Sequence, residues 1–125
     1  MELIEDDRAY LDQKAYAYDF LPDGEGGALI IRGYPVAVGK YDHDKIDLLI
    51  CIPKGYNDAK LDNFYADPPL RLKATGQYPY RADHFETHAE RNWQRFSRHL
   101  PHWRAGIDTL QNFMAVIHEE LQGGA

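Results

Sequence analysis

The sequence predicts a single α+β domain in which an antiparallel sheet is followed by a long helix. Two observations lead to this prediction. Short apolar runs typical of strands come first, between residues 15 and 72, and turn residues bound each of them. Helical periodicity comes last, over residues 107–121. Strands that precede the helix along the chain favour an antiparallel meander with helices on one side.

Length and composition agree with one globular domain spanning residues 1–125. Hydrophobic residues make up 44% of the chain and aromatic residues 13%, which is enough apolar area to build a core at this length.

The first half of the chain begins with residues 3–14, which are charged and have weak helical spacing, so we expect a short helix or an irregular cap. The aromatic stretch 15–21 predicts a first strand, and 28–34 predicts a second. Between them, residues 22–27 combine a proline with three glycines, a composition typical of a turn.

The strongest strand signal is the apolar run IDLLICI at residues 46–52, which polar turns bound at 40–45 and 53–58. Residues 61–65 predict a fourth strand. Residues 70–72 are expected to extend that edge, because the proline pair between the two segments excludes a central strand.

The second half of the chain has a less regular pattern until its last helix. Residues 73–90 have no clean period, which predicts a long irregular connection of the kind that often carries function. Residues 92–99 are expected to form one or two helical turns. The final helix is predicted from apolar residues that share one face: Ile107, Leu110, Phe113, Met114, Ile117 and Leu121.

This order of elements resembles the ubiquitin-conjugating (UBC) family. The stretch IDLLICIPKGYNDAKLDNFYADPPLRL, residues 46–72, resembles the family's third strand, its proline-and-tyrosine turn and its fourth strand. Trp103, followed by the helix from Ile107, is similar to the family's tryptophan before its long helix. The resemblance implies a four-stranded UBC-like meander with a long C-terminal helix and an irregular, active-site-like segment between them.

Residues 91–121 resemble more narrowly a bacterial branch of UBC-fold proteins, which occurs with ubiquitin-like proteins and activating enzymes. The departure from the family lies in HFETHAERNWQRFSRHLPHW, residues 84–103, which contains no cysteine where the family keeps its nucleophile. Cys51 lies on the preceding strand and does not take that place; we expect it to be a small buried hydrophobic residue. The family's His-Pro-Asn motif is also absent, with His88 and Asn92 lying roughly where it would fall.

The resemblance implies a candidate catalytic set around Ser97, which lies close to the expected position of the nucleophile. A serine hydroxyl needs a base at neutral pH, and His99, His102 and His88 are near it in sequence. Asn92 would donate to the oxyanion. The alternatives are a surface serine for Ser97 and a turn or cap residue for Asn92.

Two functions follow from these residues. In the first, the protein is a conjugating component that accepts an activated ubiquitin-like protein, as an oxyester on Ser97. In the second, it is an inactive scaffold that binds a ubiquitin-like protein or its activating enzyme. Arg95, Arg98 and Trp103 are the candidate partner-binding residues in either case, although Trp103, like Trp93 and Phe96, also fits a core position.

We predict no metal and no cofactor. His84 and His88 lie four residues apart, so their imidazoles would share a face of a helix, but the spacing alone is weak. No third ligand is obvious, although Asp83 and His99 are available. A metal-dependent hydrolase that uses His84 and His88 is the third function considered, after the conjugating component and the scaffold.

The net charge of −6 disfavours nucleic-acid partners, because an acidic domain repels phosphate. The acidic beginning MELIEDDRAY does not resemble a signal peptide, and no apolar run approaches the length of a membrane span. We therefore expect a cytoplasmic protein with no membrane contact.

Overall fold

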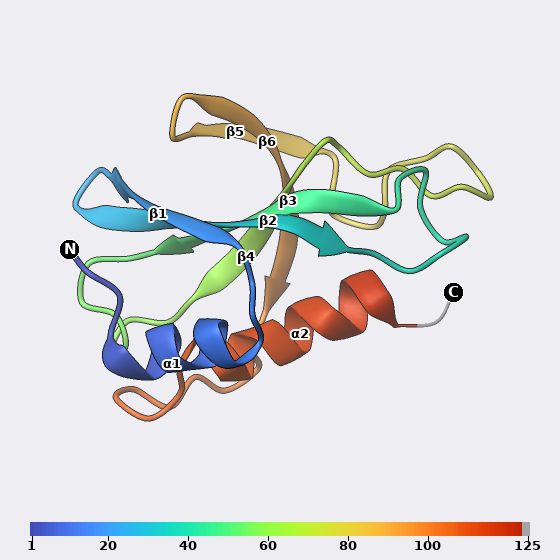
Figure 1. Ribbon diagram of the computed structural model, residues 1–125. Helices are drawn as coiled ribbons and strands as arrows, with labels where there is room; N and C mark the ends of the chain where they lie inside the picture. Colours follow the sequence, from blue (N-terminus) through green and yellow to red (C-terminus); the bar gives the residue numbers. More distant parts are fainter. Residues whose placement is uncertain (124–125) are drawn as a thin grey trace.

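A six-stranded antiparallel sheet forms the centre of the computed structural model, which describes residues 1–123 (Figure 1). The strands occur in the spatial order β1-β2-β3-β4-β6-β5. Their bounds are β1 Tyr18–Asp23, β2 Gly26–Pro35, β3 Lys45–Ile52, β4 Asp62–Asp67, β5 His84–His88 and β6 Arg91–His99. The two helices are α1, Glu5–Gln13, and α2, Leu110–Gln122. Neither helix of the described chain is long and apolar enough to cross a membrane.

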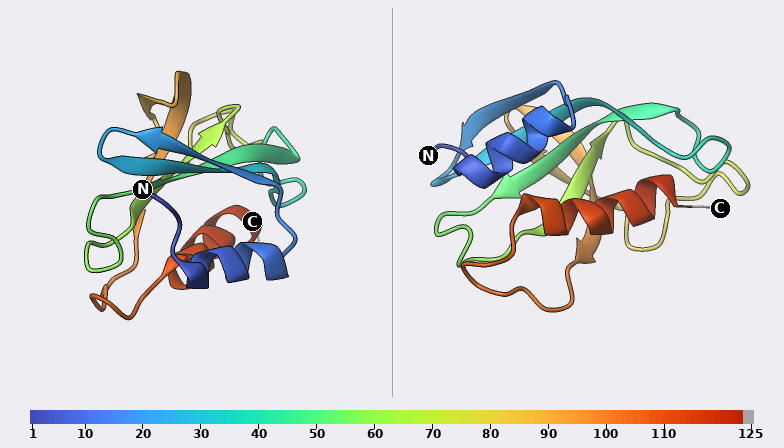
Figure 2. Two further views of the ribbon diagram at one scale, coloured as in Figure 1. Left: turned by 60° about the vertical axis from the view of Figure 1, so that its left-hand side comes forward. Right: turned by 60° about the horizontal axis from the view of Figure 1, so that its bottom comes forward.

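Both helices lie on one side of the sheet, which we call the inner face (Figure 2). Side chains alternate between the two faces of a strand, so the even-numbered residues of β3 pack toward the helices. Ile46, Leu48 and Ile50 therefore join Phe113 and Ile117 of α2 in the main hydrophobic core. Burial of these side chains against α2 explains much of the apolar run at residues 46–52.

Helix α2 confirms the predicted C-terminal helix, with Leu110, Phe113, Met114, Ile117 and Leu121 all buried. Its N-terminus is held from two sides. The Thr109 N–H donates to the side-chain oxygen of Asn112 at 2.9 Å, and the Leu110 N–H donates to Asp7 Oδ1 of α1 at 3.2 Å. Placing Ile107 on the buried face was wrong, because it precedes the helix and is 64% exposed.

The first four strands and the first helix confirm the predictions, with ends that differ by a few residues. Residues 70–72 do not extend the fourth strand; Leu72 forms only an isolated bridge with Tyr41. The predicted count of four strands is also wrong, because the sheet has six.

The largest correction concerns residues 84–99, which form the β5–β6 hairpin instead of an irregular segment followed by helical turns. His88 pairs with Arg91 across a two-residue turn, Ala89–Glu90. Both turn residues have positive φ, 49° and 63°, as a type I′ turn requires. Strand β6 then pairs with β4, so the hairpin continues the sheet beyond the four-stranded meander.

Gln94 fastens the connection between β4 and β5 to the sheet. Its side chain is fully buried and accepts from the Leu70 N–H at 2.7 Å. Its amide donates to the carbonyl oxygens of Leu70 and Ala82 at 2.9 and 2.8 Å. One buried polar side chain thus satisfies backbone groups at both ends of a long connection.

The opposite side of the sheet, the outer face, has a smaller apolar cluster of its own. It consists of Ala28, Ile30, Leu49, Tyr65 and Trp93, with Cys51 and Ala89 packed against it. The turn end of the β5–β6 hairpin rises on this side, whereas the other end of β6 reaches α2, where Arg98 pairs with Glu120 (Figure 1).

Candidate functional site

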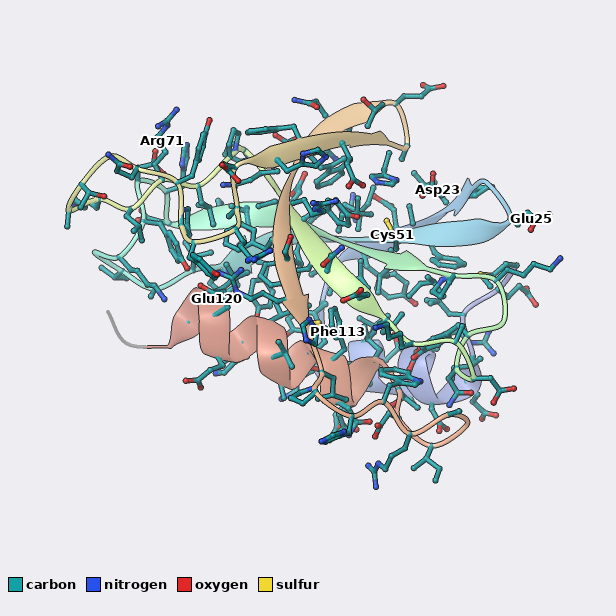
Figure 3. The ribbon with its side chains drawn as sticks, turned by 180° about the vertical axis from the view of Figure 1, so that it is seen from behind. Asp23, Glu25, Cys51, Arg71, Phe113 and Glu120 are labelled. Carbon is teal, nitrogen blue, oxygen red and sulfur yellow. The ribbon has the colours of Figure 1, made fainter. Side chains whose placement is uncertain are left out.

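Polar side chains gather on the outer face around His88, next to the smaller apolar cluster. They come from five strands that are distant in sequence: Asp23 of β1, Cys51 of β3, Tyr65 of β4, Glu86 and His88 of β5, and Arg95 of β6. Figure 3 shows Asp23 and Cys51 close together on the side of the sheet opposite Phe113. We call these six residues the outer-face cluster.

His88 is the centre of the outer-face cluster. Its Nδ1 lies 3.0 Å from Asp23 Oδ2, and its Nε2 lies 2.9 Å from Glu86 Oε1. An ionised carboxylate can only accept hydrogen bonds, so an imidazole between two of them donates from both nitrogens and is positively charged. Burial alone would lower the pKa of His88, but the bonds to Glu86 and Asp23 outweigh it and raise the pKa.

Glu86 is held by three partners at once. Besides His88, it accepts from the Tyr65 hydroxyl at 3.0 Å and from Arg95 Nη1 at 2.7 Å. Partial burial opposes ionisation, yet these bonds prevail and lower the pKa of Glu86. The carboxylate is therefore ionised at neutral pH and fixes the orientation of the His88 ring.

Cys51 lies against the same imidazole, with its Sγ 3.8 Å from His88 Nδ1. Burial, followed by the nearby charges of Asp23 and Glu86, raises the pKa of the thiol to about 12. The thiol is therefore protonated at neutral pH, and its proximity to His88 does not by itself make it a nucleophile.

The hairpin that delivers His88 is fastened to the sheet by its neighbours. Trp93 is fully buried and its indole N–H donates to the His88 carbonyl oxygen at 2.9 Å. The Arg91 guanidinium lies 4.4 Å from the centre of the Trp93 ring and pairs with Asp47 and Asp67 at 2.9 and 2.7 Å. These contacts fix the end of the hairpin above β3 and β4.

The structure separates most of the residues predicted to surround Ser97. His88 pairs with Arg91, six residues before Ser97, which corresponds to about 20 Å along a strand. Asn92 is exposed and lies five residues before Ser97, at about 17 Å. Only His99 is near, two residues further along β6 and exposed.

Ser97 itself is partly buried, and its backbone N–H donates to the Arg81 carbonyl oxygen at 3.1 Å. Within residues 1–123, its hydroxyl forms no hydrogen bond with an imidazole or an amide. His102 is exposed in the loop before α2, where it lines a cavity of about 300 Å³ with Arg104 and Asp108.

A model of the protein family described as prokaryotic E2 family E matches residues 3–123. The chain belongs to this family. No curated protein and no solved structure gives a match. Membership in an E2-like family agrees with the resemblance found in the sequence and supports a UBC-like component of a bacterial ubiquitin-like system.

Two residues predicted to bind a partner, Arg95 and Arg98, are paired within this E2-like protein. Arg95 pairs with Glu86, and Arg98 pairs with Glu120 of α2 while remaining only 18% exposed. Arg98 also lines a cavity of about 650 Å³ between the end of β6 and α2, together with His99 and Lys40. The charges of both arginines are therefore largely neutralised in the fold.

The three aromatic residues of the same region act mainly in packing. Trp93 and Phe96 are fully buried, which confirms them as core residues. Trp103 is partly buried against the main core, and its indole N–H donates to the Asn57 carbonyl oxygen at 2.9 Å. That bond ties the loop before α2 to the turn after β3.

Sequence reasoning missed Cys51, Asp23 and Glu86 as site residues. The alternation His84, Glu86, His88 fits one face of a strand, whereas on a helix Glu86 would point away from the two histidines, so it was a signal for β5. No spacing in the sequence places Cys51 beside His88, because the two are 37 residues apart and meet only through the sheet.

Proposed function

We propose that this protein is the E2-like component of a bacterial ubiquitin-like modification system and acts as a scaffold that binds a ubiquitin-like protein and its activating enzyme. Membership in prokaryotic E2 family E supports the general role. The placement of Ser97 favours the scaffold over the transferase. Its hydroxyl has no base in hydrogen-bond contact among the described residues, and a serine without a base is a poor nucleophile at neutral pH.

Cys51, the only thiol in the chain, does not replace Ser97 as the nucleophile. Cys51 lies on the outer face among Asp23, Glu86 and His88, and its pKa of about 12 keeps it protonated. A thioester would also require the bulky carbonyl of an activated partner to reach a partly buried sulfur.

A second function, transfer through an oxyester on Ser97, is favoured by one observation. Ser97 and His99 lie on the same strand, and His99 lines the cavity of about 650 Å³ beside α2. A substrate tail bound in that cavity would approach β6, and a rotation of the exposed His99 imidazole would supply the missing base.

One assay separates the two functions. The protein is incubated with the activating enzyme and ubiquitin-like protein of the same organism and ATP, and complexes are measured by size-exclusion chromatography. The scaffold predicts a stable complex without a covalent adduct, both in the wild type and in Ser97→Ala. An adduct that survives thiol reductants, is lost in mild hydroxide and is absent in Ser97→Ala would establish the oxyester instead.

Cys51→Ser is the matched control for this assay. An adduct that reductants remove and that Cys51→Ser lacks would place the acyl group on the thiol. That result would overturn both the scaffold and the oxyester on Ser97. If neither partner binds the wild type, the scaffold proposal is wrong.

A further inference from the structure

Three different donor atoms converge on the outer face of the sheet: the Cys51 sulfur, the His88 Nδ1 nitrogen and an Asp23 carboxylate oxygen. They all lie within 4.8 Å of one another. Asp23 is at the end of β1, Cys51 is on β3 and His88 is at the end of β5, so the fold brings them together from three strands. All three residues are partly buried.

A thiolate, an imidazole and a carboxylate are the three ligand types that zinc prefers in proteins. In a tetrahedral site with Zn–S of about 2.3 Å and Zn–N and Zn–O of about 2.0–2.1 Å, neighbouring donors lie about 3.3–3.6 Å apart. The Cys51 Sγ to His88 Nδ1 distance is 3.8 Å, and the Nδ1 to Asp23 Oδ2 distance is 3.0 Å. Both separations come within about 0.3 Å of this geometry, a shift that side-chain rotation can supply.

The groups around His88 have the arrangement found behind metal-bound histidines. A ligand histidine usually directs its other ring nitrogen to a carboxylate, which fixes the ring and its tautomer. Here His88 Nε2 meets Glu86 at 2.9 Å, and Glu86 is in turn held by Tyr65 and Arg95. The support leaves Nδ1 facing Cys51 and Asp23.

We propose that Asp23, Cys51 and His88 form a zinc-binding site on the outer face, with Glu86 as the positioning residue for His88. When Zn²⁺ binds, the Cys51 thiol and the Nδ1–H of His88 each lose a proton to solvent, and the ionised Asp23 carboxylate contributes an oxygen. The Zn²⁺ ion replaces these two protons, so the charge balances and no atom changes its oxidation state.

The site has room for a fourth ligand. Asp23 and Cys51 also line a cavity of about 260 Å³, whose wall includes Gly26, Gly27 and Lys60. Three protein ligands with an accessible fourth position are typical of zinc sites that retain a water molecule or accept a ligand from a partner. The metal would also link the β5–β6 hairpin to β1 and β3.

This site differs from the pair His84 and His88 considered from the sequence. His84 lies at the other end of β5, and its side chain is 59% exposed with its nearest acidic partner, Glu86, at 3.9 Å. His84→Gln is therefore a matched control: it removes an imidazole from the same strand without touching the proposed ligands.

The test uses the full-length protein after treatment with a chelator and titrates it with Co²⁺, a spectroscopic substitute for Zn²⁺. We expect one equivalent to bind with a sulfur-to-cobalt charge-transfer absorption, and Zn²⁺ to displace it. Cys51→Ser should abolish that absorption, and His88→Gln should weaken binding, while His84→Gln should behave as the wild type. Glu86→Gln should lower the affinity by about 10–100-fold through loss of ring orientation.

A second measurement uses the unaltered chain, so it does not depend on how the variants fold. Because Cys51 is the only cysteine, the rate of its modification by a maleimide reports directly on the site. Zn²⁺ should slow this reaction and Mg²⁺ should not. The proposal is overturned if Zn²⁺ leaves the rate unchanged, or if His84→Gln reduces Co²⁺ binding as much as His88→Gln.

Discussion

The inner face of the sheet is covered by α1 and α2 and is lined mainly by apolar side chains, whereas the outer face is covered by the β5–β6 hairpin and holds most of the paired charges. On the inner face, packing around residues such as Phe113 and Ile50 supplies the stability. On the outer face, Glu86, His88 and Arg95 form a network with a small apolar cluster beneath it. The comparison suggests that the inner face determines the fold, while the outer face is available for chemistry.

The largest effect is expected from the inner face. Phe113 is fully buried between α2 and the sheet, so Phe113→Ala should lower the free energy of unfolding by about 3–5 kcal/mol. Its counterpart on the outer face is Tyr65→Phe, which removes the hydroxyl bonded to Glu86 and should cost about 0.5–1.5 kcal/mol. Urea denaturation measures both. Equal losses in the two variants would contradict the division between the faces.

Charge distinguishes the two faces in a second way. Asp7 is 1% exposed on the inner side, and burial raises its pKa although it accepts a hydrogen bond from the Leu110 N–H. Glu86 on the outer face has a lowered pKa because its partners are charged or donate hydrogen bonds. A buried carboxylate without a positively charged partner thus has a raised pKa, whereas a carboxylate paired with charged groups has a lowered pKa.

The raised pKa of Asp7 gives stability a defined dependence on pH. The folded protein holds the Asp7 proton more tightly than the unfolded chain, so this contribution is fully present below the unfolded pKa of about 3.9. It is lost as pH rises through the higher folded pKa. We therefore expect Asp7→Asn to gain stability relative to the wild type with increasing pH, measured by urea denaturation from about pH 4 to pH 8. If the wild type instead gains stability relative to the variant over this range, the hydrogen bond from Leu110 outweighs the burial of Asp7.

The elements of the inner face could be predicted from the sequence. Residues 46–52 form a short apolar run bounded by turns, and residues 110–121 have the apolar period of a helix, so both elements could be recognised from their burial. The resemblance to the UBC family, confirmed at the level of the E2-like family by the match over residues 3–123, rests largely on the same segments.

The hairpin could not be predicted in the same way. Trp93 and Phe96 are three residues apart, a spacing that suggests one face of a helix, but in β6 each joins a different apolar cluster. A strand buried on both faces loses the alternation that identifies it. The turn gave no signal either, because Ala89–Glu90 replaces the asparagine and glycine that type I′ turns favour.

The outer-face cluster depended on the hairpin and was missed with it. His88 was considered as a base for Ser97, yet the hairpin turns it toward Cys51 and Asp23. Contacts between residues 23, 51 and 88 arise from the order of strands in the sheet, which no local motif in this sequence encodes.

The unfavourable turn leads to the smallest expected effect. Ala89 and Glu90 occupy the left-handed region at a cost that asparagine and glycine largely avoid. Replacing them together, Ala89→Asn with Glu90→Gly, should raise the free energy of unfolding by about 0.5–1 kcal/mol. Thr87→Gly is the control, since it places a glycine within β5 and should lower stability by a similar amount. If the double variant also binds Co²⁺ more tightly at His88, the order of the hairpin limits the affinity of the metal site. If its free energy of unfolding is unchanged, the contacts of Trp93 and Arg91 already impose the turn conformation.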